Sequence, residues 1–244
     1  MPPRTQGRDI SRPYNVNVGT FTTRLASIAI AIVVPPLLIV TSLRIVANDW
    51  IVSFEYGHGG VPADPLGLTG SERKELALTG LDSILPGGRG IDLLRDAELP
   101  SGDTAFTTRE LTHMQDVRDI VGVLFTLHLA LLVGVALLAL ALAFPRATRT
   151  IVPRGLHYGA LSTLGLAVGV GLLMLLAWNG FFETFHGIFF EGDTWRFRQS
   201  DTLLRLYPDE FWMGVGAWIA GLTVAQALIV AGGTIYWLRR VRSR

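Results

Sequence analysis

The sequence predicts an all-α polytopic membrane protein with four transmembrane helices and a small mixed α/β extracytoplasmic cap. Half of the 244 residues are hydrophobic and only 17% are charged, whereas an ordinary soluble domain carries about 25% charged residues. The apolar residues gather in four long blocks rather than in periodic stripes. Each block reaches the roughly 20 residues that a helix needs to cross the hydrocarbon core. Lipid, and not an internal core, therefore accounts for most of the apolar sequence.

The blocks divide the chain into alternating membrane and aqueous segments. We expect the first block to be a retained anchor and not a signal peptide, because its apolar run is long and no small-residue cleavage site follows. Pro35 and Pro36 are expected to kink it. In chain order the predicted segments are a tail (1–24), a first helix (25–45), the cap (46–116), a second helix (117–144), a loop (145–155), a third helix (156–181), an aromatic-rich segment (182–210), a fourth helix (211–238) and a tail (239–244).

Basic residues indicate the orientation. Under the positive-inside rule, short segments rich in Lys and Arg remain in the cytoplasm. Both ends of the chain are therefore predicted to be cytoplasmic, and the segments 46–116 and 182–210 to face outward, the first of them holding more acidic than basic residues. The arginines that carry this prediction are Arg4, Arg8, Arg12 and Arg24 before the first block, Arg146, Arg149 and Arg154 between the second and third, and Arg239, Arg240, Arg242 and Arg244 at the end.

The cap is expected to mix helix and strand. Ile51–Tyr56 alternates like a strand, and Ser71–Ser83 resembles a helix with Ser71 as its N-cap. Gly87–Gly90 is expected to form a turn. A cap of this size has little stability of its own, so we expect it to pack against the bundle or to dip into the lipid interface.

The second outer segment crowds aromatic side chains among arginines. One interpretation is an aromatic belt at the headgroup level. The other is a groove for an amphiphilic substrate, with aromatic walls for acyl chains and arginines for polar headgroups. Both remain open from the sequence. Members of the segment and its flanks include Phe181, Phe182, Phe185, Phe189, Phe190, Trp195, Phe197, Tyr207, Phe211 and Trp212, with Arg196, Arg198 and Arg205 between them.

Two histidines stand where an outer segment meets a membrane helix. His113 follows Glu110 by three residues, and His186 follows Glu183 by the same spacing. On a helix such a pair shares one face, so the acid is expected to orient the imidazole. Asp116 offers a second acid beside His113. For the three other histidines, His58, His128 and His157, structural roles are expected.

The two Glu-x-x-His pairs leave a metal enzyme as an alternative. A carboxylate-bridged di-iron site uses such pairs, but it also needs a glutamate from each of two further helices, which the first and fourth blocks lack. We therefore expect no metal and no cofactor. The chain has no cysteine and no Gly-x-Ser-x-Gly motif, so histidine-based chemistry fits better than a thiol or serine nucleophile. No glycine-rich phosphate loop or basic domain points to a nucleic-acid partner.

The stretch Phe106–Val117, reading FTTRELTHMQDV, and the stretch Phe181–Trp212, containing FFETFHGIFF and LLRLYPDEFW, resemble the Lit-type lipoprotein intramolecular transacylases, a bacterial membrane family. This resemblance implies transfer of the sn-2 acyl chain of a diacylglyceryl-modified lipoprotein to the α-amine of its N-terminal cysteine, giving a lyso-form lipoprotein. It further implies that His113 and His186 are the functional histidines, in a site facing outward from the bacterial cytoplasmic membrane.

The residue chemistry is compatible with that reaction. An α-amine with a pKa near 8 needs a base, and an imidazole with a pKa near 6.5 is suited to be one. We predict His186 as the base and His113 as its partner, with Glu110, Asp116 and Glu183 as orienting residues. Substrate contacts are expected from Tyr56, Trp195, Arg196 and Arg198. The alternative from another class is a non-enzymatic membrane protein whose cap binds lipid or a protein partner.

Overall fold

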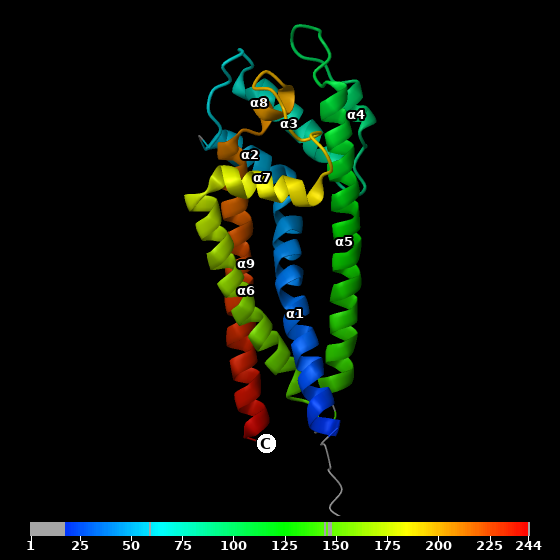
Figure 1. Cartoon of the computed structure of the whole chain (residues 1–244), viewed down its shortest axis with the longest axis vertical. Coiled ribbons are helices and arrows are strands. Elements are labelled where there is room, and N and C mark those ends of the chain that lie inside the picture. The colour runs from blue at the N-terminus through cyan, green and yellow to red at the C-terminus, as the bar shows by residue number, and fades with distance from the viewer. Residues whose placement is uncertain (1–17, 59, 144, 146–147, 244) are drawn as a thin grey trace, which may run out of the picture.

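Four long helices lie side by side in the computed structural model, which describes residues 18–58, 60–143, 145 and 148–243 (Figure 1). They are α1 (Val18–Val46), α5 (Thr108–Ala143), α6 (Ile151–Leu176) and α9 (Asp209–Arg242). Each is long and apolar enough to cross a membrane. The prediction of a four-helix, multi-pass membrane protein is confirmed. Of the arginines used for orientation, Arg4, Arg8, Arg12, Arg146 and Arg244 lie outside the described residues.

Helix α1 is the centre of the bundle, since it packs against α5, α6 and α9. Its contact with α6 is close because glycines on α6 have no side chain to separate the backbones. A Cβ added at Gly159 would lie 2.5 Å from the Cβ of Val34. Pro35 and Pro36 both lie inside α1, which continues through them.

The second membrane helix begins earlier than expected, at Thr108 instead of residue 117. Its 36 residues make α5 about 54 Å long, whereas the hydrocarbon core is about 30 Å thick. The charged residues Asp116, Arg118 and Asp119 lie in its first four turns. We therefore take the part of α5 before Asp119 as standing outside the hydrocarbon core, within the cap.

Four short helices form the cap at one end of the bundle: α2 (Asp49–Gly57), α3 (Gly70–Ile84), α4 (Asp92–Arg95) and α8 (Thr202–Leu206) (Figure 1). They share one apolar core with the first turns of α5 and α9. The cap therefore packs against the bundle instead of standing apart. Buried members of this core include Ile51, Val52, Ala77, Leu94, Phe106, Met114, Leu206 and Phe211.

The predicted strand in the cap is wrong. In the described residues no strand is assigned, and the nearest feature is an isolated bridge between Glu98 and Thr104. Residues 51–56 belong to α2, where Ile51, Val52 and Glu55 are buried on one face. A single strand without a partner would leave its amide groups unpaired, whereas a helix pairs them internally. The cap is therefore all-helical and not mixed α/β.

The helix expected at 71–83 exists, but its N-cap is Thr69 and not Ser71. Thr69 and Glu72 form a reciprocal capping box, in which each side chain accepts from the other residue's backbone N–H. This satisfies two of the amide groups that a helix start leaves free. A turn lies slightly before the one expected at 87–90, since the Gly88 N–H donates to the Leu85 carbonyl at 2.9 Å. Gly87 and Gly90 adopt φ values of 89° and 87°, which glycine tolerates without strain.

Helix α7 (Trp178–Phe189) lies across the bundle beneath the cap, roughly perpendicular to the long helices (Figure 1). The third membrane helix ends at Leu176, before the expected boundary at 181, and the chain turns at Ala177 into α7. Part of the segment predicted as an aromatic-rich outer loop is therefore a helix. None of the residues of α7 is buried, which is typical of a helix lying in a membrane interface.

Candidate active site

His113 and His186 face each other although they come from different elements. His113 lies in the second turn of α5 and His186 in the last turn of α7. Their ring centroids are 6.2 Å apart and the ring planes are tilted by 30°. This separation is short enough for both imidazoles to act on one substrate group held beside them.

The start of α5 holds His113 in place. Thr107 and Glu110 form a capping box: the Thr107 N–H donates to Glu110 Oε2 at 2.7 Å, and the Glu110 N–H donates to Thr107 Oγ1 at 3.4 Å. Such a box fixes the first turn of a helix. His113 follows one turn later on a helix whose beginning is fixed in this way.

The ring of His186 is oriented by its own helix. Its Nδ1 lies 2.8 Å from the carbonyl oxygen of Phe182, one turn earlier. Because a carbonyl can only accept, Nδ1 carries the proton, and Nε2 of the neutral ring keeps a lone pair. His186 thus presents the form of imidazole that can accept a proton through Nε2.

Aromatic rings enclose the two histidines. The segment after α7 turns at Gly192, which has φ +66°, and returns Trp195 to stack on His186 at 5.0 Å. These rings displace water from around the imidazoles. The others in contact are Phe190 and Phe197 with His113, at 4.7 and 5.4 Å between centroids, and Phe182 and Phe185 with His186, at 4.0 and 5.5 Å.

Burial of His113 and partial burial of His186 favour the neutral form of both imidazoles. His113 is 8% exposed, and its Nδ1 is a buried atom without a hydrogen-bond partner in the described structure. Burial, and then the nearby His186, lower the pKa of His113 to about 4. Burial also lowers the pKa of His186, opposed in part by the Phe182 carbonyl. At neutral pH both rings are therefore uncharged, as a proton acceptor and a neutral donor must be.

Among the described residues, no hydrogen bond or ion pair joins the histidines to the acids that were expected to orient them. Glu110 is fully buried, but its carboxylate accepts from Thr107 and, through Oε1, from the Leu203 N–H at 2.7 Å. Glu183 is exposed, and the His186 ring is oriented by the backbone carbonyl of Phe182 instead. Asp116 is half-buried and lines a cavity beside α4 instead. The three-residue spacing placed these acids on the right helices but did not identify their partners.

Of the four residues expected to contact substrate, the structure brings only Trp195 against the histidines. Tyr56 donates its hydroxyl to the Leu206 carbonyl at 2.6 Å, and its burial raises the pKa to about 12. Arg196 is exposed, stacks on Trp195 at 5.0 Å and pairs with Asp193 at 3.4 Å. The Arg198 side chain is exposed. Tyr56 therefore links α2 to α8, and both arginine side chains are exposed.

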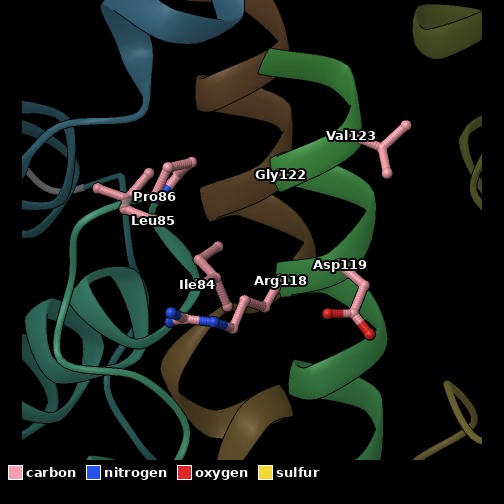
Figure 2. A pocket seen from close by; sticks show the side chains of 7 residues that line it. All are labelled: Ile84, Leu85, Pro86, Arg118, Asp119, Gly122 and Val123. Carbon is pink, nitrogen blue, oxygen red and sulfur yellow. The ribbon is translucent and has the colours of Figure 1, made fainter. Parts of the chain in front are cut away.

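Two of the cavities in the described structure lie beside α5, and neither of these two is lined by His113 or His186. The larger, of about 680 Å³, is lined by residues of α4 and α5 that include the polar side chains of Arg95, Thr112 and Asp116. The other, of about 440 Å³, lies between residues 84–86 and α5, and Figure 2 shows Arg118 extending toward that segment. Among the described residues no group of three or more His, Asp or Glu side chains is close enough to hold a metal ion.

Several residues of the site were not singled out from the sequence. Phe190 and Phe197 lay within the aromatic segment, but nothing distinguished them from their neighbours. The Phe182 carbonyl carries no residue-specific signal, because any residue has one. Arg109 donates to the Arg196 carbonyl at 3.1 Å and so joins α5 to the segment that carries Trp195. Its partner is again a backbone atom, which residue types do not reveal.

The model of the family described as "Lipoprotein intramolecular transacylase Lit" matches residues 28–212 of this chain. The chain belongs to the Lit family. The match includes both motifs, around His113 and around His186, on which the resemblance was based. The protein is therefore an acyltransferase, namely a lipoprotein intramolecular transacylase, and it is a multi-pass membrane protein.

The chain also resembles a further protein in sequence and solved structures in fold. An uncharacterized protein of Aquifex aeolicus (strain VF5) is 30% identical over 211 residues, which cover 85% of this chain and 92% of that protein. The in meso structure of the membrane integral Lit from Bacillus cereus has the same fold, with a TM-score of 0.76 at 18% identity over 92% of this chain and all of that one. A variant of it with a histidine-to-alanine mutation gives a TM-score of 0.73 at 17% identity, covering 94% of this chain and all of that one.

Proposed function

We propose that this Lit-family protein moves the sn-2 acyl chain of a diacylglyceryl-modified lipoprotein to the α-amine of the lipoprotein's N-terminal cysteine. The observation that carries the proposal is the pairing of His186 and His113, with ring centroids 6.2 Å apart and Nδ1 of His186 held by the Phe182 carbonyl. The free Nε2 of His186 is suited to accept a proton from the attacking amine.

The reaction requires no external co-reactant. The amine nitrogen attacks the ester carbonyl carbon, and His186 Nε2 takes the proton that the nitrogen loses. The tetrahedral intermediate collapses as the carbon–oxygen bond to the second glycerol carbon breaks. The leaving glycerol oxygen receives that proton back, so the products are an amide and a free hydroxyl. We assign His113 the role of donating a hydrogen bond to the negative oxygen of the intermediate.

Proximity supplies part of the rate, because amine and ester belong to one substrate molecule. The aromatic rings of Trp195 and Phe190 beside the histidines support a site for lipid chains that excludes water. Arg196 and Arg198, exposed at the rim, are placed to meet polar parts of the substrate. Because the aromatic rings exclude water, hydrolysis of the ester is suppressed.

The site is proposed to face outward. The described start of α1 and the end of α9 lie at the end of the bundle opposite the cap (Figure 1), and basic residues such as Arg149, Arg154 and Arg239 lie near that end. The positive-inside rule then places that end in the cytoplasm and the histidines at the outer boundary, where a membrane-anchored lipoprotein presents its N-terminus.

The test is turnover of a synthetic diacylglyceryl lipopeptide by purified protein, followed by mass spectrometry of the lipopeptide's N-terminus. His186→Ala should reduce the rate roughly 10²- to 10⁴-fold, the range for loss of a general base, and His113→Ala should also reduce it. His58→Ala is the matched control, since His58 is an exposed cap histidine and should leave turnover unchanged. Full activity of His186→Ala, or a product acylated from a second lipid molecule, would contradict the proposal.

A further inference from the structure

A polar cluster lies between α1 and α5, away from the paired histidines. Arg44 of α1 donates through Nη1 to the Phe125 carbonyl at 3.0 Å and lies 3.4 Å from His128 Nδ1. Its guanidinium carbon also sits 4.4 Å above the ring of Phe125. About 22 Å of helix α5 separates His113 from His128, so this cluster is distinct from the proposed acyl-transfer site.

The hydrogen bonds of His128 fix its tautomer. Its Nε2 lies 2.9 Å from Thr41 Oγ1, and that hydroxyl already donates to the Leu37 carbonyl at 2.7 Å. Thr41 must therefore accept from His128, which places the ring proton on Nε2 and leaves Nδ1 as the acceptor facing Arg44. A neutral His128 supports the guanidinium but does not compensate its charge.

No carboxylate compensates Arg44 either. Within the described chain, the ion pairs involve other arginines, namely Arg89, Arg95, Arg196 and Arg205. Arg44 is nevertheless exposed on the membrane-facing part of the bundle, less than one helical turn before α1 ends at Val46. An arginine this close to a helix end extends its guanidinium toward the interface, where lipid phosphates are available to it.

One edge of the guanidinium is left for that anion. Nη1 is directed to Phe125 and His128, whereas Nε and Nη2 have no hydrogen-bond partner within residues 18–58, 60–143, 145 and 148–243. These two nitrogens form the side-on edge with which an arginine binds a phosphate through two parallel hydrogen bonds. Below the cluster, Leu129 and Leu132 of α5 are exposed to lipid and suit contact with acyl chains.

We propose that Arg44, supported by His128, binds the phosphodiester group of an anionic membrane phospholipid at the seam between α1 and α5. Arg44 lies near the end of α1 next to the cap, from which a long side chain extends toward the level of the lipid phosphates. The lipid is a bound ligand and not the acyl donor. The site is therefore independent of the transfer reaction, and its test does not depend on turnover.

The test is native mass spectrometry of the full-length protein after exchange into detergent with a defined lipid. The wild type should retain one phosphatidylglycerol, and should retain dioleoylglycerol, which lacks the phosphodiester, at least tenfold less. Arg44→Gln should weaken phosphatidylglycerol retention roughly tenfold or more, since charge-assisted bidentate bonds are among the strongest hydrogen bonds. Arg44→Lys, which keeps the charge but not the two-pronged edge, should give an intermediate loss.

Arg95→Gln is the matched control, because Arg95 is an exposed cap arginine paired with Asp92 and should leave retention unchanged. Equal retention of phosphatidylglycerol by Arg44→Gln and wild type would overturn the proposal. An equal loss of phosphatidylglycerol retention in Arg95→Gln and Arg44→Gln would also overturn it, and thermal unfolding of each variant in the same detergent shows that the variant is folded. Displacement of the lipid by millimolar inorganic phosphate would also contradict a lipid-specific site.

Discussion

Glu110 Oε1 accepts a hydrogen bond from the Leu203 N–H at 2.7 Å, which joins the first turn of α5 to the first turn of α8. The same carboxylate accepts from Thr107 through its other oxygen. One buried side chain therefore satisfies amide groups at the starts of two helices that are distant in sequence. Because His113 lies one turn beyond Glu110, this link fixes the histidine relative to the segment that carries Trp195 and Phe197.

Removing this link should destabilise the cap. Glu110→Ala loses the cap of α5 and leaves the buried Leu203 N–H without an acceptor, which should cost about 2–4 kcal/mol. The measurement is thermal unfolding in one detergent. Glu75→Ala is the control, since Glu75 is exposed on α3 and should change stability by less than about 0.5 kcal/mol. Equal unfolding temperatures for the two variants would show that the link contributes little.

The free energy of unfolding should decrease as the pH falls, because His113 is harder to protonate in the folded protein than in the unfolded chain. Its pKa drops from 6.5 in the unfolded chain to about 4 in the folded one, so between these values the unfolded chain binds more protons. By linkage, stability is present above the unfolded pKa and decreases as the pH falls through this window, by up to roughly 3 kcal/mol. Unfolding temperatures at pH 7 and pH 4.5 test this. His113→Phe, which cannot titrate, should show a smaller decrease, and parallel curves for both proteins would refute the assignment.

Two ion pairs of the cap should differ sharply in their contribution to the free energy of unfolding. Arg205 and Asp64 lie 2.8 Å apart with side chains 8% and 0% exposed, whereas Arg95 and Asp92, at 2.5 Å, are 64% and 82% exposed. Asp64→Ala leaves a buried guanidinium unpaired and should cost about 3–5 kcal/mol. Asp92→Ala removes a solvated pair and should cost at most about 0.5–1 kcal/mol. Chemical denaturation of both variants measures the difference, and similar losses would contradict this ranking.

Adding a single methyl group where α1 contacts α6 should destabilise the protein. A Cβ at Gly159 would lie 2.5 Å from Val34 Cβ and 3.0 Å from the Ala31 carbonyl, whereas one at Gly169 on the same helix meets nothing within 4 Å. Gly159→Ala should therefore cost about 1–3 kcal/mol through overpacking. Gly169→Ala should be neutral or slightly stabilising, because alanine favours helix. The free energy of unfolding of both variants, measured in one detergent, tests this. If Gly159→Ala leaves that free energy unchanged, α1 and α6 can move apart without cost.

Much of the fold could be predicted because lipid imposes it. Apolar blocks of sufficient length must form helices, since backbone groups have no water to bind in the hydrocarbon core. The cap lacks this constraint. The six residues from Ile51 to Tyr56 fit both periodicities, and only the burial of Ile51, Val52 and Glu55 against the cap core decides for a helix. The Thr69 cap was present in the sequence as Thr-x-x-Glu, a stronger signal than Ser71 alone.

The candidate site was predicted in part. His113 and His186 were singled out by their position at the ends of membrane helices, and the fold brings their rings together. The partners of the nearby acids were not predictable, because Glu110 bonds to a backbone amide of Leu203 that only the tertiary fold brings near. The hydrogen bond from the Tyr56 hydroxyl to the Leu206 carbonyl was not predictable for the same reason, and the substrate contact expected of Tyr56 stays a prediction. Side chains that bind main-chain atoms leave no complementary residue in the sequence.

The Phe182 carbonyl that holds Nδ1 of His186 belongs to the same helical turn as the histidine itself. A substitution at residue 182 leaves that backbone carbonyl in place. The His186 tautomer with its proton on Nδ1 is therefore retained when neighbouring side chains change. It also survives any tilt or translation of α7 as a unit, because donor and acceptor travel together. A mobile α7 would deliver its imidazole already poised for proton transfer, and only unwinding of that one turn would undo it.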